Sequence, residues 1–103
     1  MAFKSGSISL GTTREIKGIV PLNGLFSVQL LSANLSGDTT FNLQFSNDGT
    51  NWGNAKEAGT DISDTLSQST VNFNSFSGVP GTRFKILFAG ATTGTVNYVL
   101  NAL

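Results

Sequence analysis

The chain has 103 residues, with six basic and six acidic side chains and neither cysteine nor histidine. This length fits one domain. A formal net charge of zero provides no long-range field to gather phosphates, which disfavours nucleic-acid binding. Without cysteine there are no disulfides or thiolate metal sites, and no acid/base or nucleophile constellation is visible. We therefore expect no enzyme, no cofactor and no metal site.

Neutral polar residues dominate the composition. The charged fraction is 12%, about half of the roughly 25% typical of soluble domains, whereas Ser, Thr, Asn and Gly make up nearly half of the chain. Hydroxyls and amides cost less to desolvate than Lys or Glu, so such a surface can be buried in subunit contacts. Two interpretations remain open: an assembling protein, or a secreted-type β domain with ordinary polar loops.

The N-terminal residues 1–6 are expected to form an arm, whose Phe3 can insert into a neighbouring subunit. A frayed terminus is the alternative. This segment lacks the apolar region of a signal peptide, and no run approaches the roughly 20 apolar residues that cross a bilayer. We expect no membrane insertion.

Short segments with apolar residues at every second position follow one another along the chain, which is typical of half-buried strands. Turn signals separate them, such as Pro21-Leu22-Asn23-Gly24 and the cluster at 34–38. Leu31 lies off the apolar side of its strand and indicates a partly covered second face. The predicted strands comprise residues 7–10, 14–20, 25–30, 41–46, 70–74, 83–88 and 96–100.

The clearest element is a β-hairpin that starts at Phe41. Asp48-Gly49 supplies residues that tolerate positive φ in a tight reversal, and Trp52 opens the return strand. Residues 53–68 are less regular and are predicted to form a solvated loop with a short strand at most.

These patterns predict a single all-β domain over residues 1–103, an antiparallel β-sandwich or jelly roll of about seven or eight strands. The core is predicted from the alternating apolar positions. It consists of Ile8, Leu10, Ile16, Phe26, Val28, Leu30, Phe41, Leu43, Phe45, Val71, Phe73, Phe84, Ile86, Phe88, Val96, Tyr98 and Leu100.

A resemblance extends over roughly residues 40 to 102. The segment Ser46-Asn47-Asp48-Gly49-Thr50-Asn51-Trp52, followed by residues 81–86 (GTRFKI) and 93–98 (TGTVNY), resembles small β-sandwich proteins of bacteriophage virions. The hairpin alone also resembles discoidin-like sandwiches. The virion resemblance implies a capsid decoration, vertex or head-fibre protein, made in the host cytoplasm, that assembles with itself as a trimer or pentamer and with the major capsid protein. The discoidin likeness implies the alternative, a glycan-binding domain for host or surface recognition.

Four residues are candidate partner or glycan contacts: Phe3, Trp52, Arg83 and Lys85. An exposed Trp52 offers a ring face to a sugar, although packing over its own hairpin is the favoured interpretation. Arg83 and Lys85 are expected to form an exposed basic pair on one strand, and Arg14 and Lys17 match them in sign. The pair is expected to contact an acidic partner surface or a neighbouring subunit, or else to protect a sheet edge from uncontrolled pairing.

The acidic residues Asp48, Glu57, Asp61 and Asp64 match no calcium-loop spacing and are expected to be solvated.

Overall fold

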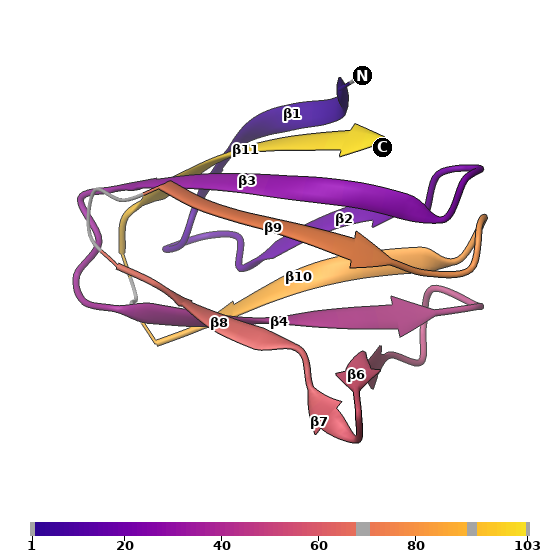
Figure 1. Cartoon of the computed structure of the whole chain (residues 1–103). Helices are drawn as coiled ribbons and strands as arrows, with labels where there is room; N and C mark the ends of the chain where they lie inside the picture. Colours follow the sequence, from indigo (N-terminus) through magenta and orange to yellow (C-terminus); the bar gives the residue numbers. More distant parts are fainter. Residues whose placement is uncertain (1, 68–70, 91–92, 103) are drawn as a thin grey trace.

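Two antiparallel sheets lie face to face in the computed structural model, which describes residues 2–67, 71–90 and 93–102, with residues 2 and 3 described as backbone (Figure 1). The β3 sheet has the order β1-β11-β3-β9, and the β10 sheet has the order β2-β10-β4, with β5 and β8 both pairing with β4. The strands are β1 Ala2–Ser9, β2 Glu15–Ile19, β3 Leu25–Ala33, β4 Thr39–Ser46, β5 Gly53–Asn54, β6 Lys56–Glu57, β7 Thr60–Asp61, β8 Ser63–Leu66, β9 Val71–Ser77, β10 Arg83–Ala89 and β11 Thr95–Ala102.

The longer strands pair in a nested order. β1 pairs with β11, β2 with β10, β3 with β9 and β4 with β8, all antiparallel. Successive longer strands alternate between the two sheets, except that β4 and β8 both belong to the β10 sheet. This is the path of a long hairpin wound around the core, which is jelly-roll topology. The predicted all-β sandwich is confirmed.

The core is built from the inward positions of both sheets. Phe26 of β3 and Phe84 of β10 stack across the interior with ring centroids 4.5 Å apart. Most of the predicted core is buried, and Ile8, Phe45 and Tyr98 pack against it while partly exposed. Sequence reasoning missed some members, which come from turns and from the region after Trp52: Val20, Leu35, Ala55 and Leu66.

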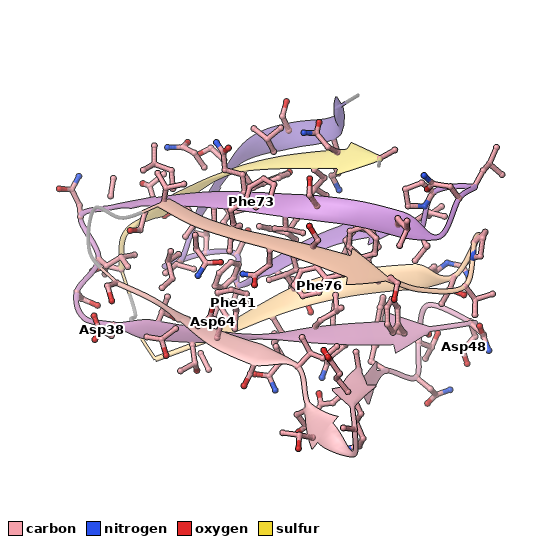
Figure 2. All side chains as sticks on the ribbon, viewed as in Figure 1. Asp38, Phe41, Asp48, Asp64, Phe73 and Phe76 are labelled. Carbon is pink, nitrogen blue, oxygen red and sulfur yellow. The ribbon has the colours of Figure 1, made fainter. Side chains whose placement is uncertain are left out.

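Strand β9 presents the opposite face to the one predicted. Val71 and Phe73 are 63% and 60% exposed, whereas Phe76 points inward and its ring lies 5.7 Å from that of Phe26 (Figure 2). Phe73 and Phe76 are three residues apart, so a regular strand can bury only one of them. Phe26 lies directly opposite Phe76 in the β3–β9 register, which fixes the choice.

Two further expectations are corrected at other segments. The sequence predicts an arm at residues 1–6, of which residue 1 lies outside the described residues; Ala2–Ser9 instead forms edge strand β1, which pairs with β11. The expected loop at 53–68 contains the short strands β5 to β8, and Leu66 of β8, which pairs with Thr39 of β4, is fully buried. The charged residues of this region are largely exposed, whereas Ala55 and Leu66 belong to the core and Ile62 packs against it.

Gly18 of β2 leaves the space that Phe84 occupies. A Cβ at Gly18 would lie 2.6 Å from Cζ of Phe84. The Phe84 ring is fully buried in the packed core, so it cannot easily shift away from this contact. We predict that Gly18→Ala lowers the free energy of unfolding by about 1–3 kcal/mol, the usual cost of overpacking. Gly53→Ala is the matched control because a Cβ at Gly53 would have no neighbouring atom within 4 Å. Urea unfolding of both variants checks this, and equal stabilities would contradict it.

Candidate functional site

The turn from Ser46 to Trp52 is held by the Asp48 carboxylate. Its Oδ1 accepts hydrogen bonds from the amides of Thr50 and Asn51, each at 2.8 Å, and from the Ser46 hydroxyl at 2.9 Å. The Asn51 side-chain amide donates to Oδ2 at 2.8 Å. These donors stabilise the ionised form and hold the pKa of Asp48 well below its ordinary range. The turn thereby fixes the position of Trp52 at its end.

Trp52 lies over the outer surface of the β10 sheet and covers Lys85. The Lys85 Nζ atom is 4.6 Å from the centroid of the indole ring and 2.9 Å from Oε2 of Glu15. Glu15 also approaches Lys17, with 3.5 Å between Oε1 and Nζ. The hydrogen bond from Lys85 is the main cause that lowers the pKa of Glu15. Lys85 is therefore a partnered cation enclosed between a ring and a carboxylate.

This arrangement corrects the expectation of an exposed basic pair. The Lys85 side chain is only 13% exposed. Strand β10 lies between β2 and β4, so Arg83 and Lys85 protect no sheet edge. Arg83 is exposed, yet its Nη1 donates to the Asn47 carbonyl at 2.8 Å and ties the turn to β10.

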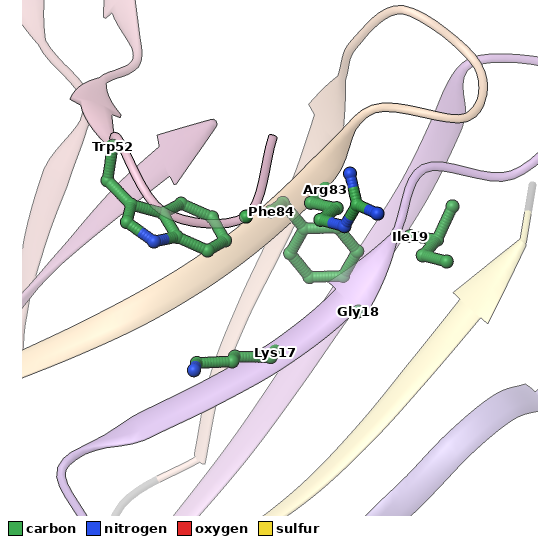
Figure 3. Close-up of a pocket in the computed structure, with 7 residues that line it drawn as sticks. Lys17, Gly18, Ile19, Trp52, Arg83 and Phe84 are labelled. Atoms are coloured by element: carbon green, nitrogen blue, oxygen red, sulfur yellow. The ribbon is translucent and has the colours of Figure 1, made fainter. Parts of the chain in front are cut away.

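An open pocket of about 280 Å³ lies beside Trp52 (Figure 3). Its lining residues come from β2, β10 and the turn: Lys17, Gly18, Ile19, Gly49, Trp52, Arg83 and Phe84. Cross-strand pairing places Ile19 opposite Arg83, and Ile19 remains 58% exposed. The indole and Ile19 supply apolar surface, whereas Arg83 and Lys17 supply N–H donors, and none of the lining residues is acidic. The pocket suits a small ring that bears hydroxyl or anionic groups.

The structure brings three of the four predicted contact residues together. Trp52, Arg83 and Lys85 meet on the β10 sheet, whereas Phe3 belongs to β1 of the other sheet and its side chain lies outside the described residues. Trp52 is half-buried, and its ring lies over Lys85 of β10, which is not part of the hairpin that contains Trp52. Sequence reasoning missed Ile19 as a lining residue, and Lys17 was noted only as a charge of the same sign. Only the β2–β10 register, which the sequence does not reveal, places them there.

The carboxylates of Asp61 and Asp64 are occupied locally. Asp61 accepts from Lys56 and from Asn54, the latter at 3.0 Å, and Asp64 accepts from Asn72 at 3.0 Å. These hydrogen bonds lower the pKa of both groups. Within residues 2–67, 71–90 and 93–102, no three acidic side chains gather as metal ligands would.

The outer surface of the β3 sheet differs in kind from that of the β10 sheet. We call it the neutral face: the outward positions of β3 (Leu25 to Ala33), β9 (Val71 to Ser77) and β11 (Thr95 to Asn101), with Ser5, Ser7 and Ser9 of β1. Strands β3, β9 and β11 contain no charged residue.

Lys4 is the one charged residue of β1, and it does not lie on the neutral face. It shares the inward side of its strand with Ile8, and its ammonium donates to the Lys17 carbonyl of β2. Among the side chains that the structure describes, the neutral face therefore carries hydroxyls, amides and apolar groups alone.

Exposed apolar residues cluster at one side of the neutral face. Leu31 is 40% exposed and lies directly opposite Val71 in the β3–β9 register, with Phe73 as the next outward residue of β9. Leu31, which lies off the apolar side of its strand and indicates a partly covered second face, belongs to this patch. Contiguous exposed apolar groups on a sheet face commonly mark a contact surface.

Comparison with known proteins finds no family model and no curated protein sequence that matches the chain. In the part of the chain that the structure describes, no helix is long and apolar enough to cross a membrane.

The donors around Asp48 make a prediction for its titration. We expect NMR titration to show the Asp48 carboxyl still ionised below pH 3.8, its ordinary pKa. A lowered pKa means that this group stabilises the fold fully above the unfolded-state value, and that the stabilisation is lost as pH falls through the folded-state value. Asn51→Ala removes the side-chain donor to Asp48, so the titration midpoint of Asp48 should be higher in this variant than in wild type. A wild-type midpoint at or above 3.8 would refute the turn geometry.

Proposed function

We propose that this chain is a structural component of a bacteriophage virion, of the capsid decoration, vertex or head-fibre type, that acts by protein–protein assembly. The observation that carries the proposal is the neutral face, a sheet surface without charged side chains on which Leu31, Val71 and Phe73 are exposed. Burying hydroxyls, amides and apolar groups against another protein costs far less than burying ammonium or carboxylate groups.

The topology gives secondary support to the proposal. Jelly rolls form many viral capsid domains, and they also form lectin domains and cupins, so the fold alone does not choose among these functions. The resemblance of the hairpin segments to phage virion proteins favours the first of them. The proposed partners are further copies of the chain and the major capsid protein, and the proposed location is the virion.

Particle composition tests this function. We expect mass spectrometry of purified virions to detect the chain at a fixed stoichiometry relative to the major capsid protein. Electron microscopy of particles made without the gene product should show missing density on the capsid, at a vertex or at a fibre. Particles that lack the protein and are unchanged by its deletion would refute a virion role, whatever the oligomeric state of the purified chain.

A second candidate function, glycan binding, is favoured by the pocket beside Trp52. An indole next to fixed N–H donors is a common arrangement for holding a sugar ring, because the ring stacks while its oxygens accept hydrogen bonds. One part of the indole already covers Lys85, so a ligand would use the remaining surface together with Ile19 and Arg83.

The single tryptophan of the chain makes this candidate directly measurable. If the pocket holds a sugar, intrinsic fluorescence should change on titration with a binding glycan, and calorimetry should show that Trp52→Ala weakens binding by about tenfold or more, which corresponds to about 1.4 kcal/mol. Lys56→Ala is the control, because this exposed cation lies outside the pocket. A glycan panel that leaves both fluorescence and heat unchanged would remove this candidate.

A further inference from the structure

We propose that the neutral face binds the same face of a second copy, so that two sandwiches pack sheet against sheet about a twofold axis. This inference rests on the proposed assembly function and names the partner at that surface. The distribution of charge over the two outer faces favours a second copy as the occupant of the neutral face.

The chemistry of the neutral face is self-complementary. Its polar groups are serine and threonine hydroxyls and the amides of Gln29, Asn97 and Asn101, and each of these carries both donors and acceptors. Two identical faces of this kind can therefore hydrogen-bond to one another. A twofold axis uses the same surface on both partners, and an axis that passes through the apolar patch places Phe73 and Leu31 of one copy against the apolar groups of the other.

The opposite face cannot serve in this way. The outer surface of the β10 sheet carries Arg83, Lys85 and Lys17 with Glu15 as the acidic partner of the two lysines, and is therefore net positive. Two copies packed through it would bring cations together with their charges desolvated, which is costly. Association of copies through a sheet face thus favours the neutral one.

The size of the face sets the expected strength of the contact. Four strands about 4.8 Å apart and about eight residues long, at about 3.3 Å per residue, cover roughly 500 Å². Two copies would bury about 1,000 Å² in total, near the lower limit for a specific interface. We therefore expect a reversible dimer whose population rises with protein concentration.

Edge pairing through β9 is the main competing geometry. This strand lies at the end of its sheet and has neither charge nor proline, the features that usually prevent edge association. In that arrangement β9 residues would lie at the contact, but β11, two strands away, would not. A substitution on β11 therefore separates the two geometries.

Sedimentation analysis of the full chain from micromolar to millimolar concentration tests the inference. We expect wild type to dimerise, and Phe73→Asp and Asn97→Asp each to weaken dimerisation by about tenfold or more, because each introduces like charges into a buried contact. Thr40→Asp is the matched control, because Thr40 is an exposed strand residue of the β10 sheet. It should dimerise like wild type, and circular dichroism should show all variants folded.

Three results would overturn the face-to-face dimer. These are a wild-type chain that stays monomeric throughout the range, an Asn97→Asp variant that dimerises normally, and a closed assembly of a different order. They are distinct from failure of the virion role: a dimer that is absent from particles refutes only the function, and a monomer that is present in particles refutes only this inference.

Discussion

The stacked rings of Phe26 and Phe84 join the interior strands of both sheets, and the rest of the sandwich depends on this contact. The ring of Phe84 fits because Gly18 on the neighbouring strand has no side chain, and Phe26 fixes the register in which Phe76 of β9 turns inward. Each fully buried phenylalanine contributes about 1.5–3 kcal/mol by burial. In a chain without disulfides, this aromatic packing takes the place of covalent cross-links.

Once these rings occupy the interior, the alternation of strands decides both outer surfaces. Every residue next to an inward ring points outward, so Lys85 beside Phe84 lies on the outer surface of the β10 sheet and Leu25 beside Phe26 lies on the neutral face. The charged residues lie on the β10 sheet, on β6 to β8 and in the connecting turns, apart from Lys4 of β1, which reaches toward β2. The two faces therefore differ because the sequences of their strands differ at the outward positions.

The strands and most of the core were predictable because alternation is a local property. The face of β9 was not, since Phe73 and Phe76 compete for the interior and only the pairing with Phe26 decides between them. The position of Asn72 on the inner side agrees with this choice, because it donates to Asp64 on β8 of the other sheet. The enclosure of Lys85 likewise depends on Glu15, which is 70 residues away along the chain. Contacts of this kind follow from register, which a sequence pattern leaves open.

The placement of the pocket and the neutral face on opposite sides of one sandwich has a consequence for assembly. Copies that pack through the β3 sheet would leave the outer surface of the β10 sheet, with Trp52, Ile19 and Arg83, directed away from the contact. Self-association and ligand binding therefore need not compete for the same residues. A dimer would present two copies of the pocket, and two linked weak sites bind a multivalent surface more tightly than either site alone. The glycan-binding candidate is thus compatible with the assembly role, because each uses a different sheet.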